Sequence, residues 1–381
     1  MRLSPVLTAT GTYPFVKLDQ AKRRLAAEGV ELIDFGKGDP REATDPLIRA
    51  ALVDSLTETS TYPLAEGLPE LRQAIAGWCG HRFGIELDPD TEIVPTYGSK
   101  EAIFSLAQVV DVTGDKRLVL TTEPGYPVPD RGAAFAGADV LRLPLLEANG
   151  FLPDLDALDE KTLARTAIFW INYPNNPTGA VAPLGFLERL SRLALEYDFL
   201  VASDEAYTEL WFDAPPHSAL EVADRTNVAV FNTLSKRSSM TGYRSGFVAA
   251  APELIAALKQ FRPTVGTAPQ EFVQHASVAA WNDEEHVGRT REIYLRKRTI
   301  LLDVLGRKGI RVAGSEATMY LWLEVPGGSS SEEFAEHLLE RGLIVSPGSF
   351  FGEAGEGYWR MALVPTEAEC RRAAEILEEA L

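Results

Sequence analysis

The chain has 381 residues, 45% of them hydrophobic and 24% charged, so it has ordinary globular composition and is long enough for two domains with separate cores. Its 37 lysines and arginines against 55 aspartates and glutamates give a net charge of −18, which argues against a nucleic-acid partner because such binding needs clustered positive charge. The N-terminal residues lack a signal-peptide pattern and no apolar stretch is long enough to cross a bilayer, so we expect a cytoplasmic protein with no membrane partner.

Cysteine and histidine usage indicates neither a disulfide framework nor a metal site. The two cysteines, Cys79 and Cys370, lie far apart in the sequence and belong to no CxxC pair, which fits a reducing compartment. The five histidines show no paired-ligand spacing. We therefore expect no bound metal.

Short apolar runs alternate with amphipathic stretches up to about residue 250. Six runs are predicted strands, at residues 92–97, 117–122, 166–171, 199–203, 227–233 and 245–250. Helical periodicity marks residues 100–110 and 184–197 between them. This alternation is typical of an α/β fold, with a large domain built on a mostly parallel sheet that helices flank on both faces.

From about residue 283 the pattern changes to a long charged helical segment, residues 284–309. Two short predicted strands follow at 319–325 and 358–363, with helical patterns at 331–341 and 366–380. These elements predict a smaller α+β domain that the N-terminal segment joins. We expect a large domain over residues 42–283 and a small domain made of residues 1–41 and 284–381.

The segment NTLSKRSSMTGYRSG, residues 232–246, follows a predicted strand and contains Lys236 and Arg244. A lysine amine can react with a carbonyl group when burial or cationic neighbours keep it neutral. A solvated loop lysine is the alternative interpretation, and it would be preferred for an isolated Ser-Lys pair.

Three further segments favour the chemical interpretation. SDEAY, at 203–207, places Asp204 at the carboxyl end of a predicted parallel strand, where α/β folds bind ligands, although a helix N-cap would also explain it. NYPNNPTG, at 172–179, supplies polar side chains on a turn, and TYGSKE, at 96–101, opens a helix whose free N–H groups can bind an anion. A reactive lysine, a carboxylate for a ring nitrogen, donors for a ring oxygen and a phosphate site together match the requirements of pyridoxal 5′-phosphate.

With these motifs in this order, the sequence resembles the fold-type I, class I and II pyridoxal-phosphate aminotransferases from about Gly36 to the C-terminus. The matching blocks are YPLAEGLPELR from Tyr62, GSKE, PGYP, NPTG, DEAY, the SK and GYR pair, PGSFFG and the arginine of YWRMAL. The resemblance implies a large domain with a seven-stranded type of sheet and a smaller α+β domain.

The resemblance also implies a role for each matching residue. Lys236 would form the Schiff base and carry the proton, Asp204 would pair with the ring nitrogen, and Asn176 and Tyr207 would donate to the ring oxygen. Tyr126 would stack on the ring.

The resemblance further implies that Gly98, Ser99, Lys100, Thr233 and Arg244 would bind the phosphate. Thr233 stands where the family commonly has serine. Arg360, with Asn176 and the Gly38 backbone, would bind the substrate. Tyr62 would reach the phosphate of a neighbouring subunit, so the family pattern implies a homodimer with shared active sites.

Within the family, blocks such as SKRSSMTGYRSGF and SPGSFFG are similar to bacterial N-succinyl-LL-diaminopimelate aminotransferases of lysine biosynthesis. The expected substrates are then N-succinyl-LL-2,6-diaminopimelate and 2-oxoglutarate, and Lys37, Lys100 and Arg237 are candidates for the distal anion. Alternatives are an aminotransferase acting on LL-diaminopimelate, aspartate, alanine or aromatic amino acids, and a C–S lyase. A regulator with an aminotransferase-like domain is less favoured, because the matching blocks begin about 35 residues from the start.

Overall fold

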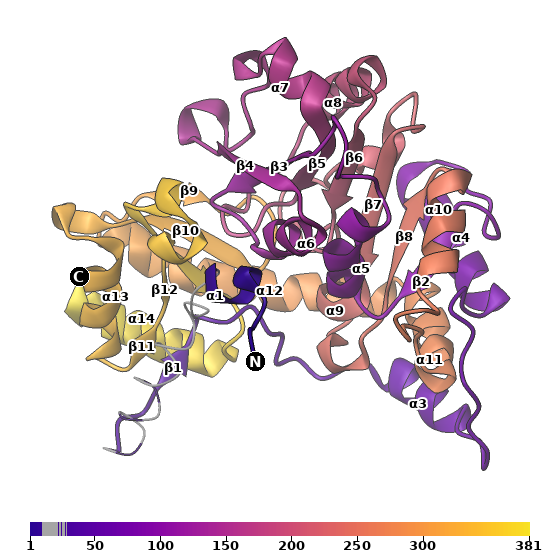
Figure 1. Ribbon diagram of the computed structural model, residues 1–381. Coiled ribbons are helices and arrows are strands. Elements are labelled where there is room, and N and C mark those ends of the chain that lie inside the picture. The colour runs from indigo at the N-terminus through magenta and orange to yellow at the C-terminus, as the bar shows by residue number, and fades with distance from the viewer. Residues whose placement is uncertain (10–21, 23, 25–26, 28) are drawn as a thin grey trace.

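The computed structural model describes residues 1–9, 22, 24, 27 and 29–381. Its largest element is a seven-stranded sheet in the order β2-β8-β7-β6-β5-β3-β4 (Figure 1). The strands are β2 (Ile93–Thr96), β3 (Leu118–Glu123), β4 (Asp139–Pro144), β5 (Thr166–Asn172), β6 (Leu200–Asp204), β7 (Val228–Thr233) and β8 (Gly246–Ala250). Of these seven strands only β8 runs against the others, since it pairs antiparallel with both β2 and β7. The predicted mostly parallel sheet is confirmed.

Helices cover both faces of this sheet. One face packs against α5 (Ser99–Ser105), α6 (Val128–Ala136) and α10 (Pro252–Phe261). The other packs against α3 (Pro46–Asp54), α4 (Pro69–Phe83), α7 (Glu160–Arg165), α8 (Leu184–Tyr197) and α11 (Glu271–Trp281). Successive residues of β5 alternate between the two apolar clusters, Ile168 and Trp170 in one and Phe169 and Ile171 in the other. Burial on both faces explains why these strands are continuous apolar runs in the sequence.

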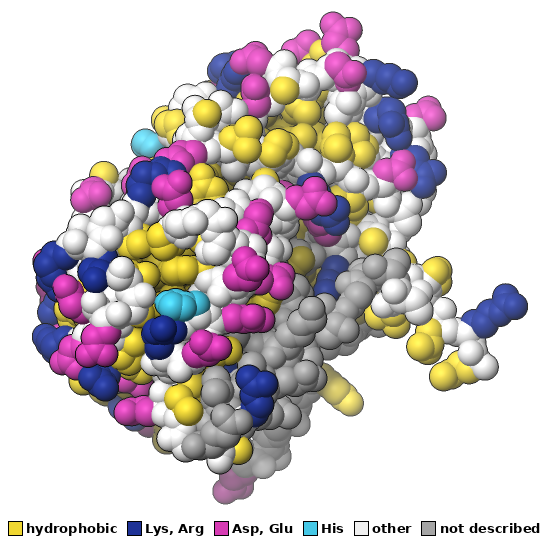
Figure 2. Space-filling model, turned by 90° about the vertical axis from the view of Figure 1, so that its left-hand side faces the viewer, with side chains coloured by type: hydrophobic (Ala, Val, Ile, Leu, Met, Phe, Trp, Pro, Cys, Tyr) yellow, Lys and Arg dark blue, Asp and Glu magenta, His cyan; other side chains and the backbone are white. Residues whose placement is uncertain are grey.

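The C-terminal third forms a second group of elements with its own apolar cluster. It contains a sheet in the order β12-β13-β10-β9 and the parallel pair β1-β11. The strands are β1 (Ile33–Asp34), β9 (Val312–Gly314), β10 (Tyr320–Glu324), β11 (Leu343–Ile344), β12 (Ser346–Pro347) and β13 (Tyr358–Ala362). The helices are α12 (Glu285–Arg307), α13 (Ser331–Leu339) and α14 (Glu367–Ala380). Figure 2 looks onto this side of the molecule, where acidic and basic side chains are interspersed around apolar ones.

The strands that the sequence did not predict lack the apolar run. β4 reads DVLRLP, and most of its side chains are exposed because it is the edge strand. β1, β11 and β12 have two residues each and β9 has three, too short for any periodicity. The predicted helix at 100–110 ends as an α-helix at Ser105 and continues as a 3-10 turn over 106–108.

The fold brings the carboxyl ends of β5, β6 and β7 together. Asn172 is in register with Asp204, and Asp204 with Phe231, so Thr233 at the end of β7 is nearby. The short helix α9 (Leu234–Arg237) follows β7 directly, and α1 (Pro5–Ala9) lies near the same end of the sheet (Figure 1). Cys79 and Cys370 are buried and are not bonded to each other. In the part of the chain that the structure describes, no helix is long and apolar enough to span a membrane.

Candidate active site

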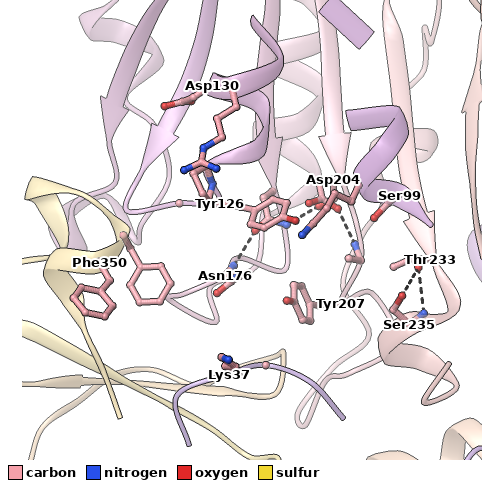
Figure 3. Close-up of a pocket in the computed structure, with 18 of the residues that line it drawn as sticks. Lys37, Ser99, Tyr126, Asp130, Asn176, Asp204, Tyr207, Thr233, Ser235 and Phe350 are labelled. Carbon is pink, nitrogen blue, oxygen red and sulfur yellow. Dashed lines mark hydrogen bonds between the residues drawn. The ribbon is translucent and has the colours of Figure 1, made fainter. Parts of the chain in front are cut away.

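A cavity of about 1230 Å³ opens between the carboxyl ends of the large sheet and the C-terminal group of elements (Figure 3). Eleven of the thirteen predicted site residues line it: Gly38, Ser99, Lys100, Tyr126, Asn176, Asp204, Tyr207, Thr233, Lys236, Arg244 and Arg360. Gly98 lies just outside, against Arg244, and Tyr62 is on the surface with its side chain fully exposed. The fold therefore gathers residues that are as far apart in the sequence as Gly38 and Arg360.

Lys236 lies in the turn of α9, immediately after β7. Its Nζ donates a hydrogen bond to the Gly38 carbonyl oxygen, which joins the lysine to the N-terminal segment. Burial lowers the pKa of Lys236 to about 8; the charges of Arg360 and Arg244 act in the same direction, whereas Asp39 opposes them. The amine is thus far easier to deprotonate than an exposed lysine, as nucleophilic or proton-transfer chemistry requires.

Asp204 ends β6 at the floor of the cavity and is 7% exposed. Burial raises its pKa to about 7, and a hydrogen bond of 3.3 Å from the Ala206 backbone nitrogen only partly offsets this. The bond to Ala206 is local, but no α-helix begins at this position, so Asp204 is not a helix cap. A buried carboxylate that forms no ion pair with any described residue would be stabilised by a cationic group of a ligand.

Asn176 and Tyr207 lie on one side of Asp204 and are oriented by neighbours. Arg360 Nη1 donates to Asn176 Oδ1 at 2.7 Å, so the amide nitrogen of Asn176 is the atom that can donate to a ligand. The hydroxyl groups of Tyr207 and Tyr320 are 2.8 Å apart. Asn172 accepts from the Asn176 backbone nitrogen at 2.9 Å and donates to the Asp204 carbonyl at 2.8 Å, which fixes the turn relative to β6.

An anion site lies at the opposite end of the floor. Ser99 begins α5, and Gly98 precedes it with a φ of +69°; a Cβ at Gly98 would be 2.3 Å from Arg244 Nη2, so backbone and guanidinium converge there. Thr233 Oγ1 donates to the Ser245 carbonyl at 2.8 Å and lies 2.9 Å from Ser235 Oγ. Backbone N–H groups at a helix start, hydroxyls and a guanidinium suit a phosphate.

Arg360 projects from β13 and is only 3% exposed. It donates to the Gly36 carbonyl at 2.7 Å, and its guanidinium lies between the rings of Tyr320 and Phe351, with centroid distances of 4.2 and 4.6 Å. The alternative of a surface arginine is excluded. A guanidinium held on one side by carbonyls and sandwiched by rings is well placed for a carboxylate.

Two of the three candidates for a distal anion line the cavity and one does not. Lys37 and Lys100 both face it, and Lys100 Nζ is 5.7 Å from the centroid of the Tyr126 ring. Arg237 does not line the cavity, so the prediction that it could bind the distal anion is wrong. It is 2% exposed, its guanidinium lies against the rings of Trp78 and Trp281, and it pairs with Glu284.

Several residues that line the cavity are not among the predicted site residues. Asn172 and Ser235 lie beside predicted residues, within the motifs NYPNNPTG and NTLSKR, and could have been included on that ground. Tyr320 and Phe350 come from the C-terminal group, where the apolar run of β10 and the PGSFFG block reveal nothing about which side chain faces a cavity. Asp130 and Arg142 belong to α6 and to the unpredicted β4.

Comparison with known proteins bears on this site. A family model described as aminotransferase class I and II matches residues 30–377. An LL-diaminopimelate aminotransferase of Nitratidesulfovibrio vulgaris is 39% identical over 379 residues, covering 98% of this chain and 97% of the relative. A crystal structure of an aminotransferase from Neisseria meningitidis superposes with a TM-score of 0.92 at 36% identity, over 99% of both chains. A probable N-succinyldiaminopimelate aminotransferase from Thermus thermophilus superposes with a TM-score of 0.89 at 31% identity, over 96% of this chain and 100% of that one.

Proposed function

The chain belongs to the class I and II aminotransferases, whose members use pyridoxal phosphate, and we propose that it exchanges an amino group between N-succinyl-LL-2,6-diaminopimelate and 2-oxoglutarate. The products are N-succinyl-2-amino-6-oxopimelate and glutamate, a step of lysine and diaminopimelate biosynthesis. The observation that carries the choice of substrate is the excess of positively charged side chains among those that line the cavity.

The residues of the cavity fit pyridoxal phosphate. Asp204 is a buried carboxylate that a cationic ring nitrogen would stabilise. Arg244 approaches the Gly98 backbone so closely that a side chain at position 98 would clash with it, and this leaves room for a phosphate beside both. When bound, pyridoxal phosphate supplies an aldehyde that takes up amino groups and a ring that withdraws electrons from the substrate α-carbon. The residues proposed to hold it, through side chains or backbone N–H groups, are Gly98, Ser99, Lys100, Tyr126, Asn176, Asp204, Tyr207, Thr233, Lys236 and Arg244.

The burial and hydrogen bonds of these residues indicate which step each would serve. Lys236, with its pKa near 8, would carry a proton at Nζ to and from the substrate α-carbon near neutral pH. Asp204 would hold a proton on the ring nitrogen, and Tyr207 and the Asn176 amide would donate to the ring oxygen. Arg360 would bind the α-carboxylate and so orient the α-carbon toward Lys236.

The cavity lining contains four basic side chains besides Lys236, Arg244 and Arg360, and two acidic ones besides Asp204. They are Lys37, Lys100, Arg131 and Arg142 against Asp39 and Asp130. The part of the succinylated donor beyond its α-carbon carries two carboxylates and no ammonium group. A locally positive cavity on a chain of net charge −18 is complementary to such a dianion.

LL-diaminopimelate is the second candidate, and the names of the relatives favour it. The relative from Nitratidesulfovibrio vulgaris is an LL-diaminopimelate aminotransferase, as is one from Aquifex aeolicus that is 41% identical over 362 residues. The free donor presents a far ammonium group beside its far carboxylate, and either Asp39 or Asp130 of the cavity lining could receive it.

A donor comparison separates the candidates. The holoenzyme is assayed with 2-oxoglutarate and either the succinylated or the free LL-diaminopimelate, with glutamate formation as readout, and with alanine, aspartate and phenylalanine as further donors. We expect kcat/KM to be at least about tenfold higher for the succinylated donor, the effect of one additional charge-assisted hydrogen bond. A higher value for any other donor would remove the proposal, and release of pyruvate and ammonia without an acceptor would indicate a lyase.

A further inference from the structure

The cavity extends beyond the predicted site, along α6 and the edge strand β4. Asp130 and Arg142 line this outer arm. In Figure 3 Asp130 lies on the far side of Tyr126 from Lys37 and Tyr207. Neither residue belongs to a motif of the sequence analysis, and above they enter only through their charge, with no contact to a particular substrate group assigned to them.

Arg142 is held by an acidic neighbour in one orientation. Its Nε donates to Asp130 Oδ2 at 2.5 Å, and Glu123 Oε2 is 4.0 Å from the same nitrogen. The Asp130 side chain is itself only 16% exposed, so this partner is fixed by the packing of α6. A guanidinium anchored through Nε keeps its terminal Nη1 and Nη2 pair for a second carboxylate.

These terminal nitrogens are accessible. The Arg142 side chain is 54% exposed, and Nη1 and Nη2 form no hydrogen bond with any residue that the structure describes. The anchored side chain loses less conformational entropy on binding than a free arginine would, which makes it a better receptor than an ordinary surface arginine.

The position of β4 sets the length of ligand that can reach Arg142. β4 is four strands away from β7, which leads into Lys236, and four spacings amount to roughly 19 Å. Side chains on both sides shorten this gap, but the far carboxylate of glutamate is only three carbon–carbon bonds of about 1.5 Å from its α-carbon. A diaminopimelate reaches two bonds further, and its succinyl group further still.

We propose that Arg142 is a specificity residue that binds the far carboxylate of long dicarboxylic amino acids, with Asp130 holding its guanidinium in position. The inference rests on the proposed function, which places the α-carboxylate of the substrate at Arg360 and so directs its far end toward Arg142. Lys100, in the first turn of α5 with its Nζ 5.7 Å from the centroid of the Tyr126 ring, is available for shorter substrates such as 2-oxoglutarate.

A series of amino acids of increasing length tests this directly. Glutamate, 2-aminoadipate and 2-aminopimelate are mixed singly with the holoenzyme, and the first half-reaction is followed by the change in cofactor absorbance. For Arg142→Gln we expect the loss of kcat/KM to grow with chain length, from less than about twofold for glutamate to roughly tenfold or more for 2-aminopimelate. Arg142→Lys, which keeps the charge but not the fork, is expected to fall between.

Arg192→Gln is the matched control, because Arg192 is 67% exposed on α8 and pairs only with Glu188 among the described residues. Its kcat/KM values should equal those of the wild type for all three amino acids. An unchanged cofactor spectrum and melting temperature show that Arg142→Gln is folded. An equal loss across the series, or none, overturns the inference.

The two proposals fail separately in this design. If the wild-type enzyme rejects the succinylated donor while the loss in Arg142→Gln still grows with chain length, the proposed substrate is wrong and the subsite stands. If the enzyme uses the succinylated donor and Arg142→Gln treats all lengths alike, the proposed function stands and the subsite is wrong.

Discussion

At the scale of single residues, Lys236 is the side chain on which the chemistry depends. Replacing it by alanine is expected to remove the visible absorbance of the lysine-bound cofactor and to lower transamination by at least 10²- to 10⁴-fold, the range for a positioned acid–base group. No other lysine that the structure describes lies so deeply in the cavity. Absorbance spectra and steady-state rates measure both effects.

Borohydride reduction of the wild-type holoenzyme provides the independent check, because it fixes the cofactor to its lysine for peptide mapping by mass spectrometry. The labelled peptide should contain Lys236. Lys161→Ala, on the exposed face of α7, is the control and should keep both colour and rate. A yellow, active Lys236→Ala protein would show that another lysine holds the cofactor.

Asp204 offers a second residue-scale prediction. Asp204→Asn keeps the shape and the local hydrogen bond but removes the charge that would hold a proton on the ring nitrogen. We expect kcat to fall by roughly 10²- to 10⁴-fold while the cofactor stays bound, and Asp204→Glu to retain more activity than Asp204→Asn. A cofactor titration and kcat for both variants decide it. An unchanged kcat in Asp204→Asn would limit Asp204 to a structural role.

The sequence could predict the positions of Asp204 and Lys236 because each lies at the end of an apolar strand or directly after one. Both residues come at the end of an apolar run, so their place at the carboxyl ends of the parallel strands follows from strand direction alone. Tyr320 and Arg142 depend on how distant elements pack, and Arg237 shows the reverse case. It is adjacent to Lys236 in sequence, but successive side chains in the turn of α9 point in different directions, and Arg237 is buried against two tryptophans that contact each other.

At the scale of elements, the apolar pattern predicted what burial dictates. Helix α8 was expected over 184–197 and spans those residues, since its buried leucines recur at helical spacing. β4 was missed because an edge strand buries little of its surface. The missed strand carries Arg142, so the outer arm of the cavity could not be foreseen from periodicity.

Glu205 joins two of these elements and makes the stability of the large sheet dependent on pH. Its Oε1 accepts hydrogen bonds from Ser203 Oγ at 2.9 Å and from the Ala219 backbone nitrogen at 2.8 Å, tying the end of β6 to the 3-10 turn at Ala219–Glu221. Burial raises the pKa of Glu205 from an ordinary 4.5 to about 7. Between these values the folded protein holds a proton that the unfolded chain releases, so this contribution to stability is lost as pH rises toward 7.

Glu205→Gln removes this dependence. The unfolding free energy of the variant minus that of the wild type is expected to rise by up to about 3 kcal/mol from pH 5 to pH 8. The reason is that only the wild-type side chain must become charged in the core as the pH rises. Urea unfolding of both proteins at the two pH values measures the difference, and other titrating groups cancel because both proteins contain them. A difference in unfolding free energy that is the same at both pH values would contradict the prediction.

At the scale of the whole molecule, the chain has a net charge of −18, yet basic side chains gather at the cavity that we propose binds anions. The basic residues that face the cavity are gathered there from α5, α6, β4, α9, β13, the turn that precedes β8 and the N-terminal segment. We also propose that the domains have the expected bounds, residues 42–283 for the large one and 1–41 with 284–381 for the small one. Ile33 and Phe35 support this, since they belong to the apolar cluster of the C-terminal group.

The remaining question at this scale is the proposed homodimer. Tyr62 is fully exposed and lies outside the cavity of its own chain, and Leu47, Val53, Leu56 and Leu64 are exposed on nearby segments. Exposed apolar side chains gathered in one region are typical of an interface. In the dimer that we propose, Tyr62 donates to the phosphate bound by the partner subunit, and loss of a hydrogen bond to a charged group in Tyr62→Phe should weaken cofactor binding by roughly tenfold or more.

Mixing two defective proteins tests whether the sites are shared. A dimer of one Lys236→Ala chain and one Tyr62→Phe chain contains one site with both defects and one with none, because Lys236 and Tyr62 of each site come from different chains. The mixed dimer, purified with two different tags after co-expression, should therefore bind cofactor at one site with wild-type affinity and show about half of the wild-type kcat per dimer. If both residues of a site came from the same chain, every site would keep a defect and the mixed dimer would be no better than the Tyr62→Phe parent.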